Sequence, residues 1–256
     1  MALLRRAGPA LALLALLLGL GCRGAGGPEP LVVASAGSLK PAFEEIGERF
    51  RSATGVPVAF HFSASGVLAQ QIAQGAPVDV FASANRRYIE ELEAMGRLEP
   101  GTRAVYALGR LALWARADAP FPLRRLQDLL DPRIRRVALA NPRLAPYGMA
   151  GREALQRAGL WDALRPKLVL GEDVRQAFQY AATGNADVAL VSLSLALSEP
   201  GKRALVPADL HAPILHELAV VAGTPRREEA RAFVRFVLGP EGRAVLARHG
   251  FGLPEE

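Results

Sequence analysis

The sequence predicts an α/β protein made of two units that are joined by two extended segments. Short apolar strand patterns and amphipathic helix patterns alternate from residue 31 onward, which is typical of a parallel sheet covered by helices on both faces. The alternation stops at an extended apolar run over 108–115, restarts, and stops again at a second run over 215–222. The second unit is therefore expected to be inserted into the first, so that the chain finishes in the unit where it began.

The first unit contains three predicted pairs of a strand and a helix. Its strands are short apolar runs bounded by turn residues, at 31–35, 57–62 and 78–83. The helix after the first strand carries Phe43, Ile46 and Phe50 on one face and ends at Gly55. The next two helices also stop at glycines, and they are expected over 67–74 and 86–95.

The second unit repeats the same alternation, and the chain then closes with two helices. The expected strands of this unit lie at 134–140, 167–170 and 188–192. The expected helices lie at 148–158 and 174–183, and those that close the chain lie near 227–237 and 240–249. Together the two units account for the chain from residue 31 to its end.

The N-terminal residues have the features of an export signal. Arg5 and Arg6 precede an uncharged apolar run that ends at Leu20 and is too short to span a bilayer. Cys22, the only cysteine, resembles the acylated cysteine of a bacterial lipobox, although Gly19 stands where that motif usually has a large aliphatic residue. We therefore expect a signal peptide over 1–21 and a lipid-anchored, flexible tether over 22–30. An ordinary secretory peptide with an incidental cysteine is the alternative.

Composition excludes several other classes of protein. A single cysteine permits no intrachain disulfide and no zinc cluster. The net charge of +6 invites a nucleic-acid partner, but the arginines are spread along the chain among acids, and an exported protein rarely meets DNA. The four histidines show no metal-ligand spacing, so we interpret them as surface or packing residues: His61, His211, His216 and His249. No cofactor is expected.

Four predicted junctions between a strand and a helix share small and hydroxyl residues. They are the segments 34–41, 63–68, 141–148 and 171–175. In open α/β sheets a ligand lies beyond the carboxyl ends of the strands, where each helix start offers unpaired N–H groups and partial positive charge. Four such starts around one cleft would bind an anion without a cationic side chain. The candidate contacts are Gly37, Ser38, Ser65, Tyr147 and Val174.

Each candidate also has a purely structural interpretation. A serine at a helix start is more often an N-cap, and Tyr147 could pack its ring in a turn. Asp173 is expected to cap its helix and to point away from an anion, which its carboxylate would repel. Asp79 is expected to be a structural hydrogen-bond partner rather than a ligand contact.

Together the motifs resemble the periplasmic molybdate-binding proteins, and the resemblance extends over nearly all of 31–253. It is carried by segments in the same order and spacing, namely 36–39, 62–72, 75–84, 140–148, 171–174, 183–187, 239–242 and 249–251. The resemblance implies a two-lobe periplasmic binding-protein fold of type II, in which two hinge strands join the lobes. Lobe 1 would comprise 31–110 and 217–256, and the inserted lobe 2 would comprise 111–216.

The resemblance also assigns roles to the candidate residues. Ser38 and Ser65 would bind the oxyanion through hydroxyl and amide groups, with an added amide near Gly37, and Val174 would donate its backbone N–H. Tyr147 would supply a hydroxyl, because this chain has the Pro-Tyr-Gly pattern. In the family's other pattern a tyrosine comes from the strand position of Ser192, so Ser192 is left unassigned. Molybdenum would be bound only as part of the oxyanion.

The function implied is binding rather than catalysis. A monomer outside the cytoplasm, in the periplasm or at the cell surface, would capture molybdate or the nearly isosteric tungstate and deliver it to an inner-membrane ABC permease. The nearest alternative is another oxyanion, such as sulfate or thiosulfate. A secreted serine hydrolase that uses Ser38 or Ser65 is a remote alternative, since neither serine lies in a Gly-x-Ser-x-Gly elbow.

The lipobox hypothesis predicts that acylation depends on a single side chain. Cells that express the protein should incorporate radiolabelled palmitate into it, because the acyl groups of a bacterial lipoprotein are attached at its first cysteine. The substitution Cys22→Ser should abolish the label, since the chain has no other cysteine. Label that persists in this variant would contradict the assignment.

Overall fold

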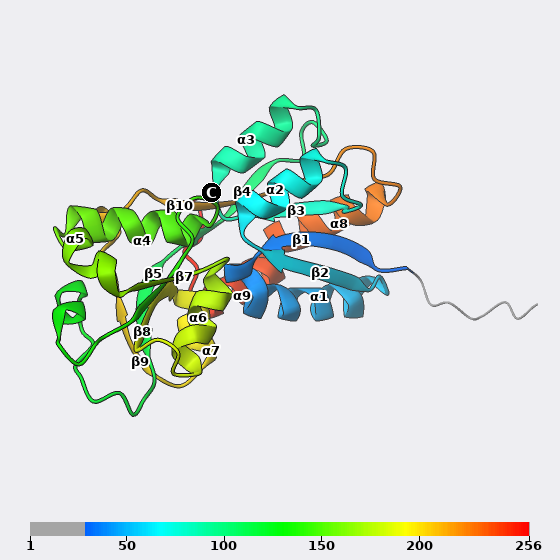
Figure 1. Ribbon diagram of the computed structural model, residues 1–256. Coiled ribbons are helices and arrows are strands. Elements are labelled where there is room, and N and C mark those ends of the chain that lie inside the picture. The colour runs from blue at the N-terminus through cyan, green and yellow to red at the C-terminus, as the bar shows by residue number, and fades with distance from the viewer. Residues whose placement is uncertain (1–28, 256) are drawn as a thin grey trace, which may run out of the picture.

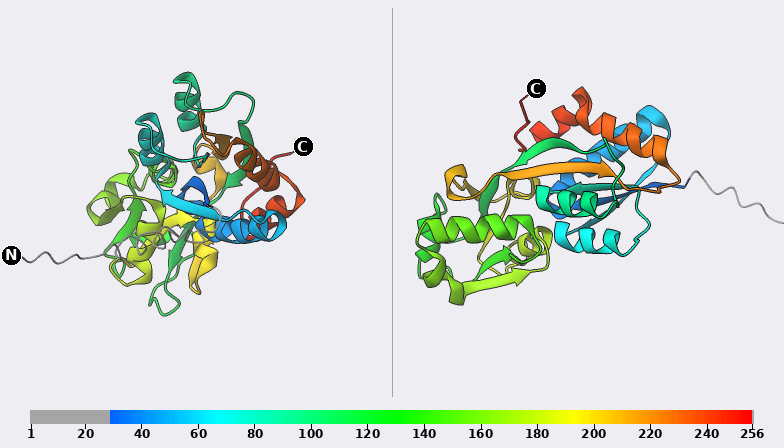
Figure 2. Two further views of the ribbon diagram at one scale, coloured as in Figure 1. Left: turned by 90° about the vertical axis from the view of Figure 1, so that its right-hand side faces the viewer. Right: turned by 90° about the horizontal axis from the view of Figure 1, so that it is seen from above.

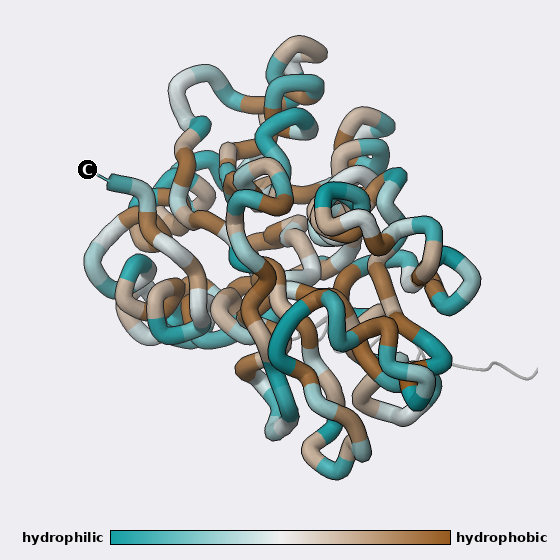
Figure 3. Tube along the Cα trace, turned by 90° about the vertical axis from the view of Figure 1, so that its left-hand side faces the viewer, coloured by the Kyte–Doolittle hydropathy of each residue, from teal (hydrophilic) through white to brown (hydrophobic). Residues whose placement is uncertain are grey.

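The computed structural model describes residues 29–255, which form two α/β lobes lying side by side (Figure 1). The predicted signal peptide and Cys22 lie outside the described residues. Hydrophobic and hydrophilic residues alternate along most of the chain, as expected for elements that bury one face (Figure 3).

The first lobe is built on a five-stranded sheet in the order β2-β1-β3-β10-β4. Its strands are β1 (Leu31–Ala36), β2 (Val58–Ser63), β3 (Val80–Ser83), β4 (Ala104–Gly109) and β10 (Ile214–Val220). Strand β1 pairs in parallel with β2 and β3, whereas β10 runs antiparallel to β3 and β4.

Helices cover both faces of this first sheet (Figure 2). One face carries α1 (Lys40–Thr54), α8 (Arg227–Leu238) and α9 (Pro240–Arg248), and the other carries α2 (Ser65–Ala73) and α3 (Arg86–Ala94). The predicted apolar stripe of α1 is buried, because Phe43 and Phe50 both pack edge-on against Phe233 of α8. Leu68, Ile89 and other apolar residues of α2 and α3 form a separate cluster on the opposite face.

The second lobe has the sheet order β7-β6-β8-β5-β9. Its strands are β5 (Leu111–Ala115), β6 (Val137–Ala140), β7 (Leu168–Gly171), β8 (Val188–Ser192) and β9 (Lys202–Leu205). Its helices are α4 (Pro146–Arg157), α5 (Trp161–Leu164), α6 (Val174–Ala182) and α7 (Leu193–Ser198). Strand β6 is parallel to β7 and β8, and β5 is antiparallel to β8 and β9.

The structure changes the sequence-based prediction in three places. Each sheet is mixed rather than purely parallel. The first strand after each crossing between the lobes, β5 in one sheet and β10 in the other, runs antiparallel to its neighbours. The single extended run expected over 108–115 is two strands, since β4 ends at Gly109 in one sheet and β5 begins at Leu111 in the other. The elements α5, α7 and β9 were not anticipated, because each is too short for its periodicity to show.

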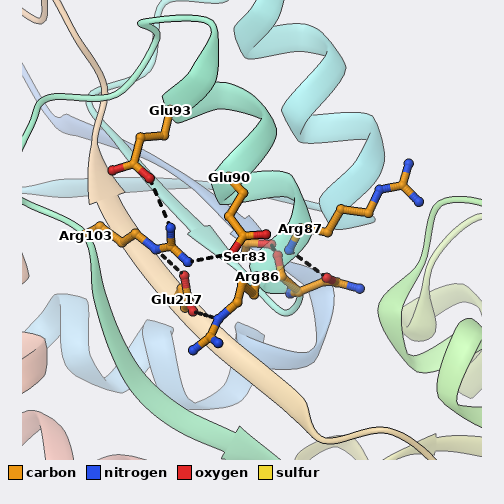
Figure 4. Close-up of polar contacts among 8 residues, drawn as sticks. Ser83, Arg86, Arg87, Glu90, Glu93, Arg103 and Glu217 are labelled. Carbon is orange, nitrogen blue, oxygen red and sulfur yellow. Dashed lines mark hydrogen bonds and ion pairs between the residues drawn. The ribbon is translucent and has the colours of Figure 1, made fainter.

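A buried carboxylate fixes β10 beside the crossing. The strand has a bulge between His216 and Glu217. The Glu217 side chain is completely buried and accepts hydrogen bonds from the Nε atoms of Arg86 at 2.6 Å and Arg103 at 2.8 Å (Figure 4). Arg103 also binds Glu93 and Glu90 at 3.0 and 3.1 Å. These contacts connect β10 with the segment before β4 and with the start of α3.

This arrangement predicts that two of the three glutamates that share Arg103, Glu217 and Glu93, differ in their contribution to stability. Glu217→Gln should lower the free energy of unfolding by about 2 kcal/mol, because the buried carboxylate accepts two hydrogen bonds from charged arginines that a neutral amide replaces only in part. Glu93→Gln is the matched control, and it should cost less than about 1 kcal/mol, because that side chain is 46% exposed. Urea unfolding would measure both, and equal losses would contradict the anchoring role of Glu217.

Candidate functional site

The five candidate residues from the sequence lie around one small cavity between the lobes. Gly37, Ser38 and Ser65 line it from the first lobe, and Tyr147 and Val174 line it from the second. Each stands where a strand gives way to a helical segment, so the structure does bring these junctions together. Whether they bind a ligand stays a prediction.

The two serines do not act as the helix caps that the sequence suggested. Ser38 lies inside a short 3-10 turn, Gly37–Leu39, and its Oγ is 3.2 Å from Nε2 of His216. Ser65 is the first residue of α2, and its Oγ accepts the amide of Ala84 at 3.0 Å. Because that bond uses a lone pair of Ser65, its hydroxyl proton remains available to an acceptor in the cavity.

Tyr147 brings an unpaired hydroxyl to the cavity. It follows Pro146 in the first turn of α4 and is only 2% exposed. Among the described residues, its Oη makes no hydrogen bond of ordinary geometry, although the Ser38 side chain lies close enough to act on its pKa. Burial raises the pKa of this phenol, so it remains a protonated donor. The ring fits because position 109 is glycine: a Cβ there would lie 2.3 Å from the Tyr147 Oη.

The start of α6 leaves one backbone donor for the cavity. Asp173 caps this helix as expected, because its Oδ1 accepts the amides of Arg175 at 2.8 Å and Gln176 at 2.9 Å. Within residues 29–255 the preceding amide, that of Val174, has no such acceptor, and Val174 lines the cavity. The capping bonds therefore satisfy the second and third amides of the helix, and they leave the first amide, that of Val174, without an acceptor.

Asp173 also lines the cavity, and the contacts of its carboxylate are with the start of its own helix. Its Oδ2 is paired with the Arg175 guanidinium, at 2.8 Å from Nη2 and 3.0 Å from Nε. The negative charge in the cavity wall is thus matched by an adjacent positive charge. The wall as a whole presents neutral donors rather than an excess of either sign.

Direct hydrogen bonds between the lobes surround the cavity. Nη2 of Arg175 donates to the Phe62 carbonyl at 2.6 Å, and the Ser194 hydroxyl donates to the Ser38 carbonyl at 2.5 Å. The amide of Gly66 donates to the Leu144 carbonyl at 3.0 Å. A Cβ at position 66 would lie 2.9 Å from that carbonyl oxygen, so glycine allows the lobes to approach. The structure is therefore a closed form.

The sequence-based interpretation missed the position of His216. Its complete burial agrees with the packing alternative, but its position next to Ser38 was not anticipated. Burial lowers the pKa of His216 to about 4. No local pattern pointed to it, because Ser38 and His216 are 178 positions apart and meet only through the sheet order.

Asp79 has the structural role that the sequence predicts. Asp79 accepts the Val32 amide at 2.7 Å and the Thr224 hydroxyl. Ser192, which was left unassigned, caps α7 and pairs with Ser194 at 3.0 Å. In the described part of the chain, no group of three or more acidic, histidine or cysteine side chains is placed to hold a metal ion.

The fold and the interlobe cavity define a binding protein whose lobes close over a small ligand. The chain matches the bacterial extracellular solute-binding protein family over residues 31–252 and belongs to it. It is 36% identical to the molybdate-binding protein ModA of Rhodobacter capsulatus over 242 residues, which cover 93% of each chain. It is 30% identical to the putative ABC transporter substrate-binding lipoprotein YvgL of Bacillus subtilis, covering 86% of this chain and 85% of that protein.

A solved structure supports the same relationship. The periplasmic molybdate-binding protein of Azotobacter vinelandii superposes with a TM-score of 0.83 at 31% identity, covering 88% of this chain and 100% of that one. The predicted two-lobe α/β fold is confirmed by this likeness. Within residues 29–255, no helix is long and apolar enough to cross a membrane.

Proposed function

We propose that this protein captures molybdate outside the cytoplasm and delivers it to an ABC transporter, with tungstate as a second ligand. The observation that carries the proposal is the buried Tyr147 hydroxyl, which lacks a partner among the described residues at a cavity lined by helix starts. A buried donor without an acceptor is costly, so an oxyanion oxygen would satisfy a group that the protein itself leaves unpaired. Both the R. capsulatus and the A. vinelandii relatives are molybdate-binding proteins by name.

The donor set fits a fully deprotonated tetrahedral anion. The hydroxyls of Ser65 and Tyr147 and the amide of Val174 are neutral donors, and they come from both lobes. Fixed donors favour oxygens that carry full charge, whereas a protonated phosphate would bring an O–H that needs an acceptor. Closing the lobes removes the anion from water and completes its set of hydrogen bonds. The closed form is the state that a transporter would recognise.

The serine hydrolase alternative gains one feature in the structure, the Ser38–His216 pair. In the Ser-His-Asp triad of a serine hydrolase, a carboxylate on the second nitrogen of the histidine orients and stabilises it. Here Nδ1 of His216 faces the carbonyl oxygen of Ile214 at 3.3 Å, and Glu217 binds arginines instead. Ser38 is also completely buried. We therefore favour binding over catalysis.

The proposal extends to the anchor and the assembly. Acylation of Cys22 would hold the protein at the membrane while residues 22–30 act as a tether, and the name of the lipoprotein YvgL is compatible with this. One protein molecule would dock on an inner-membrane permease as a monomer, because both lobes that contribute to the cavity belong to one chain.

Calorimetric titration of the mature protein tests the ligand. Molybdate and tungstate should bind tightly, sulfate should bind more weakly because it is smaller, and phosphate should bind weakly because it carries a proton near neutral pH. Sulfate binding as tight as molybdate binding would favour the alternative of another oxyanion. Failure of every oxyanion to bind would refute the proposed function.

Tyr147→Phe tests the donor from the second lobe. Removing the hydroxyl should weaken molybdate binding by about 1–3 kcal/mol, which is roughly 5- to 150-fold in Kd. The ring remains, so the fold should be retained. Tyr180→Phe, in the body of α6, is the matched control and should bind as the unmodified protein does. An unchanged Kd for Tyr147→Phe would remove this residue from the site.

A further inference from the structure

His216 is held between the anion cavity and the aromatic core of the first lobe. Its ring packs edge-on against Phe251 at 5.1 Å between centroids and lies 6.1 Å from the rings of both Tyr106 and Tyr147. Its Nε2 is 3.2 Å from Oγ of Ser38, and its Nδ1 is 3.3 Å from the carbonyl oxygen of Ile214. Each ring nitrogen therefore has one polar neighbour.

These two neighbours determine where the ring proton lies. A carbonyl oxygen can only accept a hydrogen bond, so Nδ1, which faces Ile214, carries the proton. A neutral imidazole has a single N–H, so Nε2 is an acceptor. The Ser38 hydroxyl is then the donor in the Ser38–His216 bond. In this state the Ser38 oxygen offers lone pairs, rather than a proton, to any further neighbour.

This hydrogen-bond direction conflicts with the binding of a dianion. An anion in the cavity needs donors, and lone pairs of Ser38 would repel it. If the hydroxyl turned to the anion, Nε2 would be left buried without a donor, which is unfavourable. If His216 instead took up a proton from solvent, Nε2–H would donate to the Ser38 oxygen, and the Ser38 hydroxyl would be free to donate to the anion.

We propose that His216 is a positioning residue that reverses the direction of the Ser38 hydroxyl by gaining a proton when the dianion binds. The proposal rests on the proposed function, because it takes a doubly charged oxyanion as the ligand. The proton comes from solvent and stays on Nε2, so the bound pair of imidazolium and dianion carries one net negative charge. The anion's oxygens, not its metal atom, meet the protein.

The surroundings of His216 support this coupling. The groups that face the ring from β4 and α4 are the phenols of Tyr106 and Tyr147, and burial raises the pKa of both, so they stay neutral. The 3-10 turn contributes the Ser38 hydroxyl, and the segment after α9 contributes the apolar ring of Phe251. Glu217, the next residue along β10, binds Arg86 and Arg103 instead. A bound dianion would thus be the negative charge nearest to the imidazolium.

The sign of the pH dependence follows from this arrangement. Without ligand, burial holds the pKa of His216 at about 4, so the ring is neutral near neutral pH. A nearby dianion raises that pKa. Between these two pKa values binding takes up a proton, and affinity should rise by up to about tenfold for each pH unit that the pH falls. Above the higher pKa, affinity should not depend on this group.

Calorimetry in pairs of buffers with different ionisation enthalpies tests the proposal by counting protons. Dilute molybdate should bind the unmodified protein with net proton uptake at about pH 6 and with less at about pH 8. His216→Gln should still bind, because its amide can donate to Ser38 without titrating, but proton uptake and the pH dependence should disappear. His61→Gln, at an exposed position on β2, is the control and should match the unmodified protein.

Each other outcome overturns a defined part of the argument. If the unmodified protein binds molybdate without proton uptake, the role of His216 is refuted but the proposed function is not. Uptake that persists in His216→Gln would place the proton on the anion or on another group, and would also refute that role. Absence of any molybdate binding would refute the proposed function and this proposal with it. If His216→Gln does not fold, nitrogen-15 spectra of the unmodified protein decide, since Nε2 should change from unprotonated to protonated on ligand addition.

Discussion

The cavity between the lobes is lined by hydrogen-bond donors that are buried without acceptors among the described residues. Such donors are unfavourable in a protein interior, yet the Tyr147 hydroxyl is 2% exposed and unpaired among the described residues. The donors come from two separate sheets, so they converge only while the lobes are in contact. Folding, lobe closure and binding are therefore linked, because the chain must place these donors where a ligand can reach them and where few acceptors of the protein itself can.

Strand β10 contributes both to the cavity and to the contacts that hold the first lobe together near the crossing. Its bulge separates two consecutive residues with different tasks, because His216 contacts Ser38 at the cavity while Glu217 binds Arg86 and Arg103. The ion pairs fix the strand close to the crossing between the lobes, and the rigid strand in turn fixes the imidazole. A histidine on a mobile loop could not control the direction of a single hydroxyl.

Charge in the cavity wall is balanced rather than excluded. Asp173 is needed to cap α6, and its carboxylate would repel an anion if it stood alone. Arg175 neutralises it and, with the same guanidinium, reaches the Phe62 carbonyl of the opposite lobe. Arg175 therefore both reduces the repulsion between the Asp173 carboxylate and a bound anion and stabilises the contact between the lobes.

Periodicity and capping are local properties of the chain, so the sequence predicts the alternation of strands and helices, the junctions that line the cavity and the capping role of Asp173. It predicted the candidates Ser38, Ser65, Tyr147 and Val174 for the same reason, and the structure places them around one cavity. Tertiary structure alone decided the mixed sheets, the contact of Ser38 with His216 across 178 positions, and that of Arg175 with Phe62 across 113. Such contacts depend on sheet order and lobe closure, which no local pattern encodes.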